Sequence, residues 1–226
     1  MRKVLGTLGV AALAAVLGCS GGNSTAPTGQ VSPSPSSATN SAKPAATDQG
    51  GKAPTATGAG AITPENSKIE FVGTKNDGKG ANKHDGGFKK FSGSVMPIDG
   101  DITKATINVE IDVASMWTNA DPKLGTHLQS PDFFDVKQFP TAKFVSKEIK
   151  AEKKDDTNYV ISGDLTLHGV TKPVSIPAKI TTADDGVTID GKCIIDRREF
   201  DFGKKFAAPA VNNDITIKVV AKVARK

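Results

Sequence analysis

The fold follows from the stretch Tyr159-Val-Ile-Ser-Gly-Asp-Leu-Thr-Leu-His-Gly-Val-Thr-Lys-Pro173. Its large apolar side chains occupy alternate positions, at Tyr159, Ile161, Leu165 and Leu167. A period of two puts one face on a core and the other in water, which predicts a strand. Gly169 permits a turn, and a second alternating run from Val174 to Ile180 follows Pro173. The stretch therefore predicts a β-hairpin.

Six further segments carry the same signal, near residues 69–74, 88–98, 103–115, 142–152, 187–196 and 215–224. Turn residues such as Asp99-Gly100 and Asp185-Gly186 separate several of them. Eight antiparallel strands with one apolar face each, and no long helix to cover it, must close into a barrel or pair as a sandwich. A barrel of eight strands is just wide enough to be filled by side chains or to hold one slender ligand.

Residues 117–140 depart from the strand period. Asp121-Pro122 and Ser130-Pro131 each place a capping side chain before a proline suited to a first helical turn, which predicts two short helices. Phe133 and Phe134 are adjacent, so in a helix both are buried only where two apolar surfaces meet. This segment is predicted to be a lid over the barrel mouth.

The N-terminal part of the chain predicts export and anchoring. Arg2 and Lys3 precede an apolar run, and residues 1–18 have the character of a secretory signal peptide. Val16-Leu17-Gly18-Cys19 resembles a bacterial lipobox, in which Cys19 becomes the acylated first residue. Residues 20–61 are mostly Ser, Thr, Ala, Gly and Pro, so residues 19–61 are predicted to be a lipidated, disordered tether. We expect an exported, membrane-anchored lipoprotein of the cell envelope, in the periplasm or at the cell surface.

All ten Phe, Trp117 and Tyr159 lie after residue 61, so residues 62–226 are predicted to form one domain. The formal net charge is +5, but basic and acidic residues are interleaved and form no basic stripe. The electrostatic footprint of a nucleic-acid-binding protein is missing, and we expect no nucleic-acid partner. The sequence leaves the oligomeric state open, a homodimer included.

The residues from Gly163 to Pro173 closely resemble the signature hairpin of the YceI-like family of secreted lipid-binding proteins. Residues 130–136 with Phe139-Pro140 and Phe144 resemble its acidic double-phenylalanine segment, and Arg197 with Phe200 and Gly203 resembles its last-but-one strand. Phe71 and Asp85-Gly-Gly-Phe88 extend the likeness, which covers residues 62–226. The resemblance implies an all-β, eight-stranded, antiparallel lipocalin-like barrel around an elongated apolar ligand, with short helices over the mouth.

Under this reading the barrel is an envelope-anchored carrier or sequestering protein for a polyisoprenoid or fatty-acyl lipid, with no other cofactor. Strands of about eight residues give a bore of roughly 20 Å, so a long polyprenyl tail would have to bend or protrude. The predicted ligand-binding side chains are Phe71, Phe88, Phe91, Val109, Ile111, Trp117, Phe133, Phe134, Phe144, Leu167 and Ile189. The alternatives are a ligand-free structural or protein-interaction barrel, or a metal enzyme.

The metal alternative depends on His84, His127 and His168, the only histidines, which share no short ligand spacing. We predict no metal site and no enzyme, and place these histidines at the polar rim. Arg197 is in phase with Ile195 and points inward, to meet an acid, a ligand head or a barrel-end carbonyl. Cys193 alternates with apolar neighbours and is predicted to be a buried apolar residue, not a catalytic nucleophile.

Overall fold

A computed structural model describes residues 59–225, except for residues 77, 121, 154–156 and 209. The predicted signal peptide, Cys19 and the tether up to residue 58 lie outside the described residues. In the described part, no helix combines the length and the apolar character that a membrane crossing requires.

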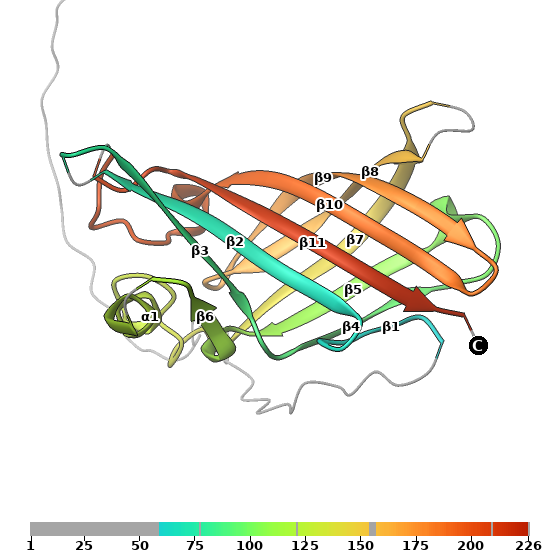
Figure 1. Cartoon of the computed structure of the whole chain (residues 1–226), viewed down its shortest axis with the longest axis horizontal. Helices are drawn as coiled ribbons and strands as arrows, with labels where there is room; N and C mark the ends of the chain where they lie inside the picture. The colour runs from blue at the N-terminus through green and yellow to red at the C-terminus, as the bar shows by residue number, and fades with distance from the viewer. Residues whose placement is uncertain (1–58, 77, 121, 154–156, 209, 226) are drawn as a thin grey trace, which may run out of the picture. The chain divides into compact units, whose positions relative to one another are not determined.

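The described chain forms one sheet with the strand order β1-β4-β5-β7-β8-β9-β10-β11-β2-β3-β6 (Figure 1). The strands are β1 (Ala61–Ile62), β2 (Ser67–Asn76), β3 (Ala81–Phe88), β4 (Phe91–Met96), β5 (Thr106–Asp112), β6 (Met116–Thr118), β7 (Thr141–Ala151), β8 (Asn158–Leu167), β9 (Val170–Ala183), β10 (Gly186–Asp196) and β11 (Asp214–Ala224). The helical elements are α1 (Pro122–Gln129) and the 3₁₀ turns η1 (Ile102–Lys104), η2 (Val113–Ser115) and η3 (Arg197–Phe200).

The eleven segments make eight long strands, because three pairs continue one another. β3 and β4 together pair with β5 and β6, with Phe88 opposite Met116 and Phe91 opposite Ile111. β1 and β2 likewise pair with β4 and β3. Each long strand is antiparallel to the next, and β11 pairs with β2, which closes the sheet into a barrel. The predicted all-β antiparallel barrel is confirmed, with breaks in three of its strands.

The hairpin that carries the family resemblance forms as predicted. Leu167 pairs with Val170, and the two residues between them take positive φ, at 52° for His168 and 74° for Gly169. These angles are those of a type I′ turn, which matches the right-handed twist of the flanking strands.

One end of the barrel, which we call the base, is closed by apolar packing. The connection between β4 and β5 folds back over it and buries Ile98 and Ile102, both 6% exposed. The Arg225 side chain donates hydrogen bonds to the carbonyls of Ile98 and Ala183, and so joins β11 to this connection and to the end of β9. Gly60, just before β1, donates to the Ala224 carbonyl at the same end.

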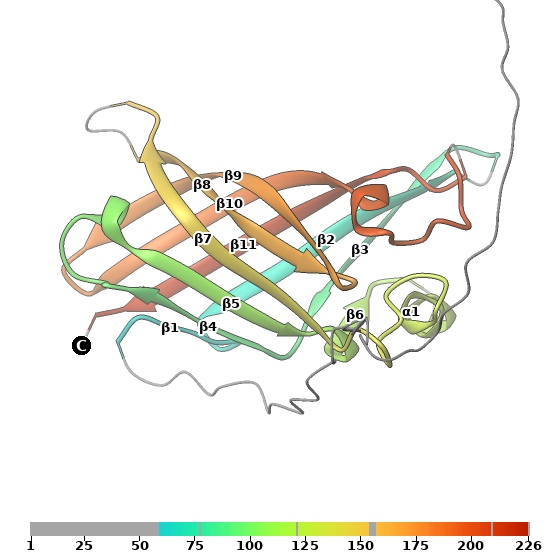
Figure 2. The same ribbon diagram turned by 180° about the vertical axis from the view of Figure 1, so that it is seen from behind.

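The opposite end, the mouth, carries α1, residues 130–139 and the loop formed by residues 201–208 and 210–213, which we call the roof loop (Figure 2). The helix predicted at Asp121-Pro122 forms from Pro122 onward. The second predicted helix does not form, because residues 130–138 make successive turns instead. There the Phe134 amide bonds the Leu128 carbonyl, and the amides of Phe133 and Asp135 both bond the Ser130 carbonyl.

Candidate functional site

An apolar cavity of about 280 Å³ runs inside the barrel from the mouth toward the base. Side chains from every long strand and from the mouth segments line it. They include Phe71, Val109, Leu165, Ile176, Ile217 and Val219 from the strands, and Leu124, Leu128, Phe202 and Phe206 from the mouth. These six strand side chains are in phase with the core yet only half-buried, because they face an internal space rather than packed atoms.

Nine of the predicted ligand-binding residues border this cavity: Phe71, Phe88, Val109, Ile111, Phe133, Phe134, Phe144, Leu167 and Ile189. Phe91 does not. It faces inward, opposite Ile111, but neighbouring side chains of the core cluster cover it and leave it 5% exposed.

Trp117 does not border the cavity either, and the glycines at positions 86 and 87 explain why. A Cβ atom on Gly86 would lie 2.4 Å from the Phe71 ring, and one on Gly87 would lie 2.9 Å from Trp117 Nε1. Adjacent strand residues face opposite sides, and Phe71 is inside, so Trp117 crosses the outer face of Gly87. The two glycines let an inner and an outer ring approach the same strand.

Aromatic rings pack at the mouth in two layers. Phe134 contacts Phe71, Phe88 and Phe202, with ring centroids 6.3, 6.3 and 4.3 Å away. Phe133 stacks on Phe206 of the roof loop at 4.9 Å with planes 8° apart. Both residues are 7% exposed, so the adjacent pair is buried between the barrel interior and the roof loop, where two apolar surfaces meet.

Arg197 holds the roof loop from below. Arg197 is only 1% exposed. Its guanidinium donates hydrogen bonds to five backbone carbonyls of the loop: those of Phe202 at 3.1 Å, Gly203 at 2.6 Å, Val211 at 3.2 Å, Asn212 at 3.0 Å and Phe206. A further bond reaches Asn213 Oδ1 at 3.3 Å. Of the three predicted partners, backbone carbonyls are the ones present. Burial lowers the pKa of Arg197, and the neighbouring Asp196 carboxylate opposes that effect.

The three histidines occupy different places. His84 on β3 and His127 on α1 both border the cavity near the mouth. His127 also lies 3.5 Å from Asp132, which accepts a hydrogen bond from Lys205 at 2.5 Å. This contact links α1 to the roof loop. The hydrogen bond from Lys205, and to a smaller extent that from His127, holds the pKa of Asp132 below its usual range.

His168 sits in the β8–β9 turn against Phe139, with ring centroids 4.3 Å apart, and does not border the cavity. Its Nδ1 is buried without a hydrogen-bond partner. Within residues 59–225, the described side chains include no cluster of three or more His, Cys, Asp or Glu that could hold a metal ion.

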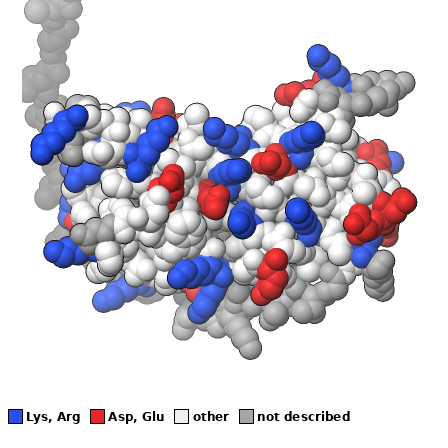
Figure 3. Space-filling view, viewed as in Figure 1, with Lys and Arg blue, Asp and Glu red and all other residues white. Residues whose placement is uncertain are grey.

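Cys193 faces the cavity from β10 and is 8% exposed. Burial raises the pKa of its thiol to about 11, so at neutral pH the thiol stays protonated and behaves as an apolar lining group. On the face of the barrel shown in Figure 3, lysines and acidic residues are interspersed over the strands. The cavity is lined mainly by apolar side chains, and the Arg197 guanidinium beside it is engaged by backbone carbonyls.

The chain matches the model of the YceI-like domain over residues 61–223. It is 42% identical to the UPF0312 protein plu2095 of Photorhabdus laumondii over 95 residues. The aligned segment covers 42% of this chain and 47% of that protein. A UPF0312 protein of Pseudomonas putida strain W619 is 43% identical over 95 residues, covering 41% of this chain and 47% of that protein. The chain thus spans about half the length of the curated relatives it matches.

Solved structures share the barrel. BcnA of Burkholderia cenocepacia superimposes with a TM-score of 0.63 at 27% identity, over 72% of this chain and 99% of that one. A polyisoprenoid binding domain from Saccharophagus degradans superimposes with a TM-score of 0.56 at 13% identity, over 74% and 99% of the two chains. The match to the family model covers most of the chain, and the protein belongs to the YceI-like family.

Proposed function

We propose that this protein binds an elongated apolar ligand, a polyisoprenoid or a fatty-acyl lipid, inside its barrel. The observation that carries the proposal is the apolar cavity of about 280 Å³ between a filled base and a mouth. Each methylene moved from water into such a cavity contributes about 0.8 kcal/mol before the cost of association. The Saccharophagus degradans domain has the same fold and is a polyisoprenoid binding domain, which is consistent with a chain-like ligand in a barrel of this kind.

Binding rather than catalysis is favoured by the chemistry of the lining. Cys193, the thiol inside the cavity, has a raised pKa, and the guanidinium of Arg197 is fully engaged with backbone carbonyls and one amide oxygen. Neither group is arranged as an activated nucleophile or a general base.

Mass spectrometry tests the proposal. The protein would be released from its native envelope by proteolysis within residues 20–58, without detergent, and analysed intact and after organic extraction. We expect a stoichiometric isoprenoid or acyl species. The Ile217→Trp variant, which fills the cavity, should lose this species, whereas Ile194→Trp, at a position that faces outward and is 64% exposed, should keep it. An empty wild-type protein that takes up no prenyl or fatty ligand would rule out the proposal.

We also propose that Cys19 anchors the protein to the cell envelope, so that the barrel carries or sequesters its ligand close to a membrane. The support is the lipobox-like sequence before Cys19. Metabolic labelling with an alkyne fatty acid should label the wild type and Cys193→Ser but not Cys19→Ser. Labelling that survives in Cys19→Ser would contradict the anchor. A carrier should also deliver bound lipid to acceptor vesicles, whereas a sequestering protein should retain it.

A further inference from the structure

The cavity ends on a layer of buried side chains near the base. Six residues both border the cavity and belong to the fully buried core cluster: Ile62, Ile69, Ile107, Ile161, Ile189 and Ala221. We call this set the floor. It draws on six strands, β1, β2, β5, β8, β10 and β11, and is therefore a layer across the barrel rather than one obstructing side chain.

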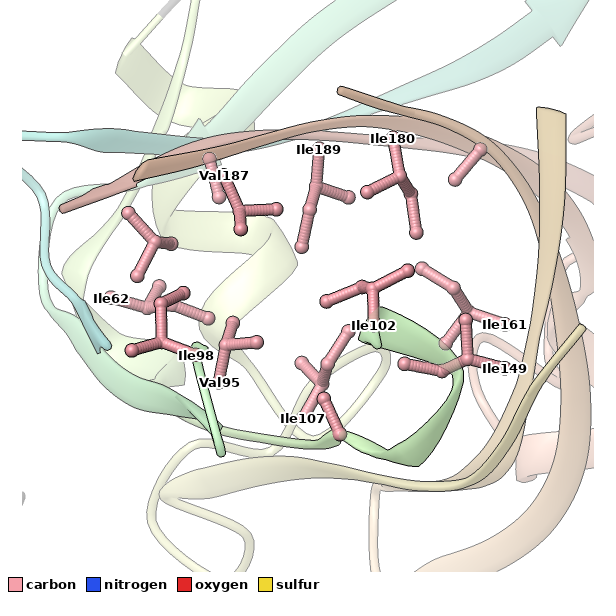
Figure 4. Packing of buried hydrophobic residues seen from close by; sticks show 14 of the residues in the cluster. Ile62, Val95, Ile98, Ile102, Ile107, Ile149, Ile161, Ile180, Val187 and Ile189 are labelled. Atoms are coloured by element: carbon pink, nitrogen blue, oxygen red, sulfur yellow. The ribbon is translucent and has the colours of Figure 1, made fainter. Parts of the chain in front are cut away.

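Buried side chains of the core cluster fill the barrel toward the base. Val95, Val187 and Val223 are 0%, 2% and 2% exposed, and none of them borders the cavity. Ile98 and Ile102 from the β4–β5 connection belong to the same buried cluster, and Figure 4 shows their side chains among those of the strands. An inserted chain therefore meets packed side chains at the floor, and cannot continue without opening the core.

The register of β10 gives the depth of the hollow part. Ile189 is in the floor, and Ile195, six positions later on the same face, borders the cavity near the mouth. Six residues of strand are about 20 Å long, which corresponds to about 15 Å along the axis of a barrel whose strands tilt by about 40°. The hollow part is shorter than the roughly 20 Å bore that strand length alone suggests.

The floor also fixes the direction of a bound chain. Every floor side chain is apolar, so a polar group buried there would find no hydrogen-bond partner. His84 and His127 border the cavity near the mouth. A ligand with one polar end is therefore accommodated with its apolar end on the floor and its polar end at the mouth.

We propose that the floor limits the length of lipid chain that the cavity accommodates. The protein selects single-chain lipids whose apolar part is about 15 Å long, and longer chains extend out of the mouth. This inference rests on the proposed function and adds to it a limit on chain length. It predicts a specific energetic signature. Affinity should rise about fourfold with each added methylene while the chain extends toward the floor, and then level off once the chain reaches it.

The test is calorimetric titration of the delipidated full chain with saturated fatty acids of increasing length. Wild type should show a break between the rising and the level part of the series. Ile189→Ala deepens the floor and should move the break to a longer chain, with about fourfold tighter binding per methylene newly admitted. Ile98→Ala is the matched control, since it removes the same atoms from a residue that is buried but off the cavity; it should leave the break in place.

Val219→Phe provides a second variant that adds volume where a cavity exists. Val219 pairs with Ile69 of the floor and is half-buried, so the larger ring has space and should move the break to a shorter chain. Affinity that keeps rising without a break, or a break that moves equally in Ile98→Ala and Ile189→Ala, overturns the length limit while leaving lipid binding intact. Absence of binding for every fatty acid and isoprenol would instead overturn the proposed function itself.

Discussion

The base and the mouth of this barrel are built from the same alternating strands but are closed by different forces. At the base, Ile149, Val187 and Val223 are buried in the apolar core cluster and do not border the cavity, so closure is apolar. At the mouth, the roof loop is held by hydrogen bonds to Arg197, by stacked rings and by the Lys205–Asp132 ion pair. The difference indicates that apolar packing closes the base, whereas polar contacts and stacked rings hold the mouth around an internal space.

The largest expected effect concerns the mouth. In Arg197→Met, the buried carbonyls of the roof loop lose their donor, and each unsatisfied carbonyl costs about 1–3 kcal/mol. We expect the free energy of unfolding to fall by about 4 kcal/mol if several carbonyls stay buried and unpaired. Urea denaturation measures it. Arg197→Lys keeps a charge but has fewer donors, and should lie between the two proteins; equal stability of all three would show that polar contacts do not hold the mouth.

A matched pair of isoleucines compares the base with the cavity wall directly. Ile149 is 2% exposed and off the cavity, so Ile149→Ala should destabilise the protein by about 3 kcal/mol. Ile217 is half-buried against the cavity, so Ile217→Ala adds to an existing space and should cost about half as much or less. Both would be measured by urea denaturation of delipidated protein. Equal losses would mean that the cavity wall is packed as tightly as the base.

Thiol reactivity offers a smaller and more local comparison. Burial raises the pKa of Cys193 from 9.0 to about 11, so its thiolate fraction at pH 8 is about a hundredfold below that of an exposed cysteine. In a Cys19→Ser background we expect slow labelling by iodoacetamide, slower still with a fatty acid bound. Ile194→Cys, combined with Cys193→Ser, places an exposed thiol one residue away and should react fast in both states. Fast reaction of Cys193 would show that the cavity admits water freely.

The smallest expected effect is a pH dependence of the contact between α1 and the roof loop. The Lys205 hydrogen bond, and to a smaller extent His127, lower the pKa of Asp132. A carboxylate with a lowered folded-state pKa contributes stability above its ordinary pKa and loses it as pH falls through the folded-state value. Protease cleavage in the roof loop should therefore be constant near neutral pH and increase only in acid below the ordinary range of an aspartate.

Asp132→Asn serves as the control for this pH dependence. It removes the titrating group, so cleavage of the variant should be faster near neutral pH and should not increase further in the same acid range. A wild type whose cleavage rises at mildly acidic pH would contradict the assignment to Asp132, because a lowered pKa moves the loss to lower pH, not higher.

Alternation along the strands predicted most of the barrel, since it states which face of each strand is apolar. Alternation could not predict how far the cavity extends into the barrel. Val109 and Phe91 are both inward-facing, but only Val109 borders the cavity, because packing by other strands covers Phe91. The sequence predicts Ile98 at the end of a strand and Ile102 just after the turn at Asp99-Gly100, whereas β4 ends at Met96 and both residues lie in the connection that fills the base.

The mouth was harder to predict, because its contacts join residues far apart in the sequence. The phase of β10 predicts that Arg197 points inward, but its partners between Phe202 and Asn212 are backbone carbonyls, which any residue supplies. Trp117 is aromatic and close to the mouth, yet it lies outside, and the only signal was the pair Gly86-Gly87 opposite it. The motif predicts His168 at the rim, and in the structure its ring packs on Phe139 in the β8–β9 turn and does not border the cavity.

The hydrogen bond from Gly60 to Ala224 places the point where the preceding chain enters the domain at the base, opposite the mouth. The preceding chain is therefore attached to the closed end of the barrel. The forty or so residues expected before it would span about 35 Å as a flexible chain, against about 30 Å for the axial length of β11. If that segment is the flexible tether that the sequence predicts, its length would decide whether the mouth of the barrel can reach a membrane surface that holds Cys19.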